Sequence, residues 1–365
     1  MFGTYRTLLA LMVVALHLGG LSMGGYAVFG FYVLSGYLMT LIMQNNYGYS
    51  ALGFYKYALN RFLRIYPIYW VSIVFSAILV WYFGQGFARG FNSAIFLPTN
   101  ISDLARNVFL YLSPVEAPRL TPPAWALTVE LFYYVVIGVG VSRNKLLTLI
   151  WFAASVAYHF VTLILGFGWE QRYYTIPAAS LPFSTGALIF HYRPQFSQFV
   201  DRLKGSLYEY LPYIIFASIL GNWLVGDLLG RTTGAFFYSN YILCSIMVVV
   251  LSRRKTLPFI SKRFDGWMGD FSYPIYLFHF QIGMLAISLL GAAGIDLERP
   301  NLLLMVVSIP LIFAFSWVVT LSLERPIELL RAKVKKDSRL RVASKNGRGA
   351  MPPSLNLPPR LAKAR

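Results

Sequence analysis

Residues 301–323, NLLLMVVSIPLIFAFSWVVTLSL, contain no charged side chain. An α-helix of about 20 apolar residues crosses the ~30 Å hydrocarbon layer of a bilayer, because each residue adds about 1.5 Å of helix length. This stretch is therefore long enough and apolar enough to span a membrane. It decides the fold class, because comparable stretches recur along most of the chain.

The composition agrees with a membrane protein. Of 365 residues, 57% are hydrophobic and only 13% are charged, which leaves too much apolar surface for one soluble core. We predict an all-α integral membrane protein, a bundle of about ten transmembrane helices. The predicted spans are 5–23, 26–44, 66–84, 124–142, 146–166, 175–191, 209–227, 235–252, 271–292 and 301–323.

One further segment, 94–112, is amphipathic rather than apolar. It carries Asp103 and Arg106 and is followed by a group of prolines that begins at Pro114. Because charged residues and prolines disfavour a buried span, we predict an interfacial helix followed by a loop.

The distribution of basic residues predicts the orientation. With the N-terminus inside, the inner loops and the tail hold 25 of the 32 basic residues, the outer loops hold 6, and Arg6 lies in the first span. Such a bias places both termini in the cytoplasm. A cleaved signal peptide over 1–25 is the alternative, but a histidine would be unusual in its apolar core.

We divide the chain into a membrane domain, 1–325, and a basic tail, 326–365. The tail is rich in Lys, Arg and Pro with few large apolar residues, so we expect disorder and contact with anionic lipids, or simply a solvated tail that fixes the topology. The net charge of +18 lies between apolar runs and in the tail, not on one amphipathic face. We therefore expect no nucleic-acid partner.

Some chemistries lack the residues they need. The single cysteine, Cys244, lies in an apolar run, so thiolate metal sites and disulfides are not expected. No P-loop, HExxH motif or Cys/His cluster occurs in the sequence, and we expect no bound metal.

Ionisable groups inside a bilayer are costly, so each one is a functional candidate. Arg6 and His17 are eleven residues apart, which places them on one face of the first span, about 16 Å apart along its axis. Glu130 lies at a depth similar to that of His17. The two could act together, with Glu130 supporting His17 as general base, or the pair could only hold two helices together.

The segment NRFLRIYPIYW places Arg61 and Arg64 at positions i and i+3, at the cytoplasmic start of the third span. Two arginines at this spacing could clamp phosphate groups. They could equally bind lipid headgroups beside an aromatic belt of Tyr66, Tyr69 and Trp70. The spacing alone does not decide between these interpretations.

Taken together, these segments resemble the acyltransferase-3 family of membrane O-acyltransferases. The resemblance covers about residues 5–323 and rests on five motifs in the family's order. They are YRTLLALMVVALH with Arg6 and His17, VFGFYVLSGYLM with Ser35, RFLR with Arg61 and Arg64, PAWALTVELFYYV with Trp125 and Glu130, and SYPIYLFHF with Tyr276 and His279.

The resemblance implies transfer of an acyl group, usually acetyl, from acetyl-CoA to a carbohydrate or lipid-linked saccharide of the bacterial envelope. Acyl-CoA would be a donor substrate at the inner membrane, with no permanently bound cofactor. The histidine that matches His17 would be catalytic, and the arginines that match Arg6, Arg61 and Arg64 would bind the donor. His17 could deprotonate the acceptor hydroxyl or carry the acyl group itself; both routes stay open.

Other motif residues would have supporting roles: Ser35, Trp125, Tyr276 and His279. We expect His279 to donate or accept a hydrogen bond that shapes the tunnel. Ser35 lacks an obvious base at its own depth, so we predict that the SGY segment serves close helix packing through Gly36. His159 is expected to be a hydrogen-bonded structural histidine.

Two other functions fit a polytopic protein with buried charges. A transporter or flippase of a lipid-linked saccharide would be expected to show inverted repeats, and we find no convincing repeat. A polysaccharide polymerase would be expected to have large external loops, whereas the longest predicted here, 85–123, is modest. The oligomeric state is not predicted.

Overall fold

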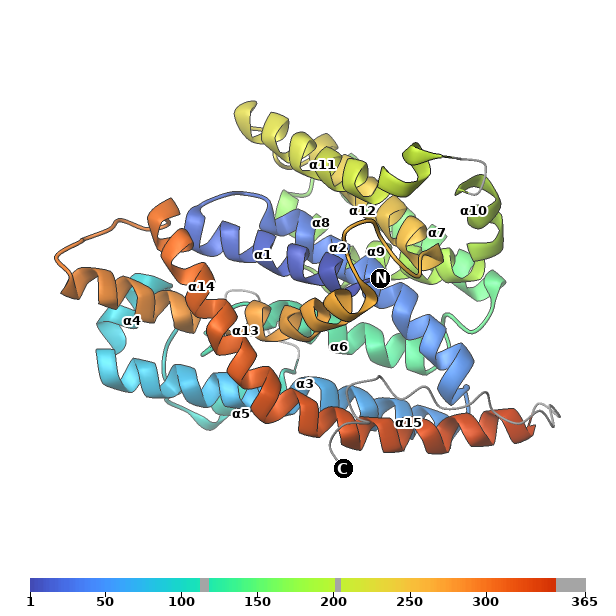
Figure 1. Ribbon diagram of the computed structural model, residues 1–365, viewed down its shortest axis with the longest axis horizontal. Coiled ribbons are helices and arrows are strands. Elements are labelled where there is room, and N and C mark those ends of the chain that lie inside the picture. The colour runs from blue at the N-terminus through green and yellow to red at the C-terminus, as the bar shows by residue number, and fades with distance from the viewer. Residues whose placement is uncertain (112–117, 201–204, 346–365) are drawn as a thin grey trace.

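The computed structural model describes residues 1–111, 118–200 and 205–345, and this part of the chain is helical with no β-strand. The elements, drawn in Figure 1, are α1 (Gly3–Gly19), α2 (Gly24–Ile42), η1 (Met43–Tyr47), α3 (Ala51–Phe83), α4 (Gln85–Phe91), α5 (Ile101–Phe109), α6 (Ala124–Gly138), α7 (Lys145–Ile164), α8 (Trp169–Tyr173), α9 (Ile176–His191), α10 (Arg193–Val200), α11 (Ser206–Leu228), α12 (Ala235–Arg253), α13 (Lys262–Ala292), α14 (Leu302–Val319), η2 (Thr320–Glu324) and α15 (Arg325–Lys345).

Seven helices in the described part are long and apolar enough to cross a membrane. The predicted count of about ten is not confirmed. Helices α1, α6 and α9 occupy three of the predicted positions but have only 17, 15 and 16 residues. The seven are Gly24–Tyr47, Ala51–Phe83, Lys145–Ile164, Tyr208–Leu228, Ala235–Arg253, Lys262–Ala292 and Leu302–Lys335.

The centre of the bundle is built from α1, α2, α9 and α13. Helix α1 packs against α13 and α2, and α2 packs against α9. Figure 1 shows α1, α2 and α9 between α11 and α12 on one side and α3 and α15 on the other. In the most apolar window of α2, 78% of the residues are buried, against 22% in α7 and in α11. The latter two therefore present their apolar side chains outward, where lipid would solvate them.

Helices α2 and α9 approach closely at two glycines. A Cβ at Gly36 would lie 2.1 Å from the carbonyl oxygen of Phe183, and one at Gly186 would lie 2.0 Å from that of Val33. No side chain fits at either position, so the backbones can touch only because both residues are glycine. The predicted close packing through Gly36 is confirmed.

The bundle has two distinct ends. At the end that holds His17, the backbone N–H of Asn301 donates to the carbonyl of Leu18 at 2.8 Å, and Arg299 donates to the carbonyl of Gly90. Figure 1 shows α4 and the α13–α14 connection at this end, with α10 and α15 at the other. We call them the His17 end and the Arg6 end.

The predicted interfacial helix over 94–112 is shorter in the structure. Helix α5 begins at Ile101 after Asn100, whose side chain accepts from the N–H of Asp103 at 2.8 Å. Tyr66 and Trp70 donate to backbone carbonyls of α5 at 2.7 and 3.0 Å. These aromatic residues therefore hold α5 against α3, and Pro114 lies outside the described residues.

The structure describes the first part of the basic tail. Helix α15, Arg325–Lys345, packs against α3 and η1. The partners are polar: the side-chain amide of Asn60 donates to the carbonyl of Arg331 at 3.3 Å, and Arg64 pairs with Glu324 at 2.6 Å. A segment with few large apolar residues can thus be ordered by its neighbours. Residues 346–365 lie outside the described residues.

Candidate active site

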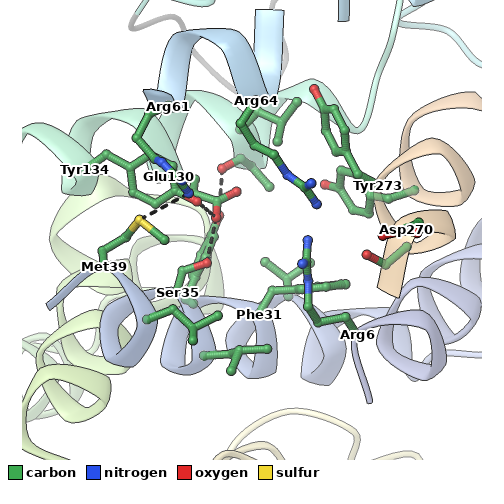
Figure 2. Close-up of a pocket in the computed structure, with 18 of the residues that line it drawn as sticks. Arg6, Phe31, Ser35, Met39, Arg61, Arg64, Glu130, Tyr134, Asp270 and Tyr273 are labelled. Carbon is green, nitrogen blue, oxygen red and sulfur yellow. Dashed lines mark hydrogen bonds between the residues drawn. The ribbon is translucent and has the colours of Figure 1, made fainter. Parts of the chain in front are cut away.

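A cavity of about 320 Å³ lies among α1, α2, α3, α6, α13 and α15 (Figure 2). Its lining is mixed, with apolar side chains from α2 and charged side chains from α1, α3, α6, α13 and α15. Sequence motifs far apart in the chain therefore meet around one space. Its charged residues are Arg6, Arg61, Arg64, Arg331, Glu130, Asp270 and Glu328.

Two guanidinium groups face each other across this cavity. Figure 2 shows the side chains of Arg6 and Arg64 pointing toward one another. Arg64 forms an ion pair with Glu324 at 2.6 Å, and Arg6 lines the same cavity from α1. Like charges repel, so an anion between the two groups would stabilise this geometry.

Arg61 adds a third cation. Its Nη2 donates to the side-chain oxygen of Asn60 at 2.5 Å and its Nη1 contacts the sulfur of Met39 at 3.6 Å; both partners are uncharged. The Nε of Arg61 and the Nη2 of Arg64 are buried without a hydrogen-bond partner. Both arginines line the cavity.

Glu130 and Ser35 meet beside Arg61, on the other side of the cavity from Arg6 (Figure 2). The Ser35 hydroxyl donates to Oε1 of Glu130 at 2.6 Å, and the Tyr134 hydroxyl donates to the same oxygen. The expectation that Ser35 lacks a potential base at its own depth was wrong. The sequence offered one signal for Tyr134, because a residue four positions after Glu130 lies on the same helix face.

His17 lies outside the cavity lining and pairs with a second histidine. Its Nδ1 lies 2.8 Å from Nε2 of His279, the two rings are within 5° of parallel, and the ring of Phe280 lies 4.8 Å from that of His17 between centroids. His17 therefore pairs with His279, while Glu130 accepts from Ser35 of α2. The catalytic roles of His17 and Glu130 stay predictions.

The hydrogen bonds of His279 assign the proton positions. Its Nδ1 lies 2.8 Å from the carbonyl oxygen of Tyr276, which can only accept, so Nδ1 carries the proton. In a neutral imidazole Nε2 is then an acceptor, and His17 must donate from Nδ1. This leaves the Nε2 lone pair of His17 free to take a proton or attack a carbonyl.

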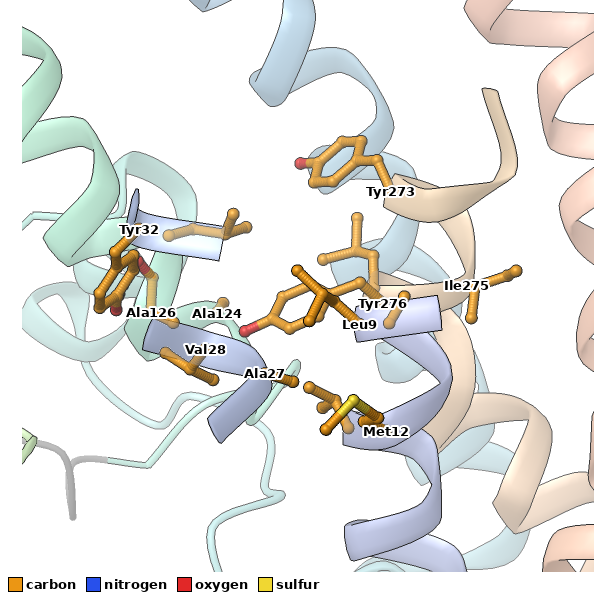
Figure 3. Packing of buried hydrophobic residues seen from close by; sticks show 14 of the residues in the cluster. Leu9, Met12, Ala27, Val28, Tyr32, Ala124, Ala126, Tyr273, Ile275 and Tyr276 are labelled. Atoms are coloured by element: carbon orange, nitrogen blue, oxygen red, sulfur yellow. Dashed lines mark hydrogen bonds between the residues drawn. The ribbon is translucent and has the colours of Figure 1, made fainter. Parts of the chain in front are cut away.

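Tyr276 connects the cavity with the histidine pair. It lines the cavity, precedes His279 by three residues on α13 and donates from its hydroxyl to the carbonyl of Pro123 at 2.8 Å. The ring of Phe31 packs against it edge-on at 6.0 Å. Figure 3 shows Tyr276 near Leu9 of α1, with its hydroxyl directed toward the start of α6. Three helical residues correspond to about 4.5 Å, so the cavity ends roughly one turn from His279.

The remaining motif residues take other positions. Trp125 packs against Tyr173 and Tyr174 at 5.8 and 5.1 Å between ring centroids and does not line the cavity. His159 bonds to the hydroxyl of Tyr238 and the carbonyl of Ala178, both at 2.9 Å, which confirms a hydrogen-bonded structural histidine. Within the described ranges, no three His, Cys, Asp or Glu side chains gather to hold a metal ion.

Residues 4–321 match the family model described as an acyltransferase domain, acyltransferase-3, which covers nearly the whole chain. The chain belongs to the acyltransferase-3 family. Neither the curated proteins nor the solved structures contain a match to it. This acyltransferase-3 protein is thus a multi-pass membrane acyltransferase, and the resemblance seen in its motifs is confirmed. The match ends before α15, so Glu328 and Arg331 line the cavity from outside the family domain.

Proposed function

We propose that this acyltransferase transfers an acyl group, in the first instance acetyl, from cytoplasmic acyl-CoA to a hydroxyl of an envelope carbohydrate at the bacterial inner membrane. The proposal rests above all on Arg6, Arg61 and Arg64, which line one buried cavity on a membrane acyltransferase. A donor that carries a diphosphate and a long thioester arm fits this combination of clustered cations and mixed walls.

The donor would enter at the Arg6 end. The excess of basic residues in the loops and tail of that end supports a cytoplasmic location. A cavity of about 320 Å³ lies within the range of small-molecule sites, about 300–1,000 Å³. The diphosphate would lie between Arg6 and Arg64 with Arg61 beside it, and the arm would extend past Phe31 and Tyr276 toward His17.

His17 would perform the chemistry from its Nε2. In the direct route, Nε2 takes the proton of the acceptor hydroxyl as that oxygen attacks the thioester carbonyl. The carbon–sulfur bond breaks, and the departing thiolate receives the proton from His17. In the covalent route, Nε2 attacks the carbonyl first and the carbon–sulfur bond breaks, which leaves an acyl-imidazolium and a thiolate. The acceptor hydroxyl then takes the acyl group from Nε2, and its proton goes to the thiolate.

His279 would act as a positioning residue in either route. By accepting from Nδ1 of His17 at 2.8 Å, it fixes the tautomer whose Nε2 is unprotonated. The Nδ1–H of His279 itself donates to the carbonyl of Tyr276. Glu130 would shape the donor cavity through Ser35 and Tyr134 rather than assist His17.

The test is mass spectrometry of envelope glycans from cells without the gene, complemented with the wild-type chain or with His17→Ala. An acyl mass increment that depends on the wild-type chain would support the proposal and identify the acyl group. His159→Ala is the matched control, since it removes a buried histidine remote from the cavity. Identical glycans in all strains, with a saccharide transport defect, would contradict acyl transfer and favour the flippase.

A further inference from the structure

A second, smaller cavity of about 40 Å³ adjoins the first at the Arg6 end. The two share Arg61, Glu328 and Arg331 as lining residues, so they meet at these side chains. A single water needs about 10–15 Å³ on this measure, so the smaller space has room for a group larger than water. The other residues around it are Ile42, Asn46, Tyr47, Asn60 and Lys335.

The charged residues that line this second cavity are mainly basic. Arg61, Arg331 and Lys335 contribute three positive charges and Glu328 one negative charge. Glu328 pairs with Nη1 of Arg331, and its side chain is 56% exposed, against 12% for that of Arg331. The carboxylate therefore lies at the solvent edge, and the guanidinium is the group turned inward.

Two residues that line this cavity each carry a buried donor without a hydrogen-bond partner. The Nε atoms of Arg61 and Arg331 are both inaccessible to solvent and make no hydrogen bond in the structure. A buried donor without an acceptor costs roughly 1–3 kcal/mol, so an anionic group with several oxygens would relieve both. A phosphate monoester has the charge and the acceptor oxygens that two guanidinium groups recognise best.

We propose that the tail helix α15 completes the donor site, with Arg331 and Arg61 binding the ribose 3′-phosphate of coenzyme A in the second cavity. This inference rests on the proposed function, because it needs the diphosphate at Arg6 and Arg64 in the adjoining cavity. It assigns a binding role to a segment outside the family domain. The carbonyl of Arg331 anchors this segment to Asn60 at 3.3 Å, and Glu324 anchors it to Arg64 at 2.6 Å.

The test compares coenzyme A with dephospho-coenzyme A, which lacks only the 3′-phosphate, on the purified full-length chain. Their dissociation constants are measured by calorimetry in nanodiscs of neutral lipid. The wild-type chain should bind coenzyme A roughly 10- to 100-fold more tightly, the ratio expected for a charge-assisted contact. In Arg331→Ala the ratio should fall by roughly tenfold, because only Arg61 remains at the phosphate.

The matched control is Lys333→Ala, which removes a positive charge from an exposed position of the same helix and should keep the wild-type ratio. Arg331→Lys should give an intermediate ratio, because it keeps the charge but loses the planar fork. The comparison on the wild-type chain needs no variant, so it holds even if Arg331→Ala does not fold.

Three other results of the binding comparison would each overturn the proposed subsite. Equal binding of the two ligands by the wild-type chain would overturn the phosphate subsite while leaving donor use intact. A second outcome is a ratio of one together with weaker coenzyme A binding by Arg331→Ala only in nanodiscs that contain anionic lipid. The cavity would then bind a lipid phosphate, and the inference would be wrong. Binding of neither ligand would overturn the proposed donor as well.

Discussion

The hydrogen bond between His17 and His279 gives the sharpest test of the proposed chemistry. In His279→Ala the acceptor of the 2.8 Å bond is lost, and the imidazole of His17 is free to carry its proton on either nitrogen. Only the tautomer with an unprotonated Nε2 can act. The buried Nδ1–H also loses its partner, which costs about 1–3 kcal/mol of stability.

The expected kinetic effect can be bounded. General-base catalysis contributes about 10²–10⁴ in rate, and loss of a charged orienting group costs up to about 10⁴. A neutral imidazole orients less strongly than a carboxylate, so we expect kcat to fall about 10²-fold, equal to ~2.7 kcal/mol in the barrier. The donor KM should stay unchanged, because His279 does not line the cavity.

The assay follows thiol release from acyl-CoA by the purified chain in nanodiscs, with the acceptor glycan found by mass spectrometry. His279→Gln should recover activity to within about tenfold of the wild type, because its amide oxygen can accept from His17. Size-exclusion behaviour and thermal unfolding report whether each variant is folded. A folded His279→Ala protein with full kcat, or with a changed donor KM alone, would refute the assignment.

Three further predictions concern the cavity and the core. Arg61→Ala should raise the donor KM roughly 10- to 50-fold with little change in kcat, as measured by steady-state thiol release, because it removes a charge-assisted contact; a fall in kcat alone would count against this role. Glu130→Gln should keep kcat and its pH profile, since the amide oxygen still accepts from Ser35 and Tyr134, whereas a general-base partner of His17 would lose activity. Gly36→Leu should abolish folding, because the backbone of α9 occupies the space that the side chain needs. The control Gly221→Ala, with no atom within 4 Å of its Cβ, should have an unfolding temperature within a few degrees of the wild type. A stable Gly36→Leu protein would disprove the close contact.

The sequence by itself determined the fold class and the family. Stretches such as 301–323 indicate a membrane environment, because the apolar content of a segment can be read without knowing which segments it contacts. The spacing of Arg61 and Arg64 placed both on one helix, and the order of the motifs identified the acyltransferase-3 family. Close packing at Gly36 was also predictable, since small residues mark helix contacts.

Only the tertiary structure decided which side chains meet. The sequence indicated the depth of His17 and Glu130, but depth does not fix the direction in which a helix turns its side chains, and His279 took the position expected for Glu130. Likewise, composition alone did not indicate that Arg331 lies beside α3, because its partner Asn60 is some 270 positions away in the sequence. Contacts between distant segments depend on how the helices pack, and no local pattern in the chain records that packing.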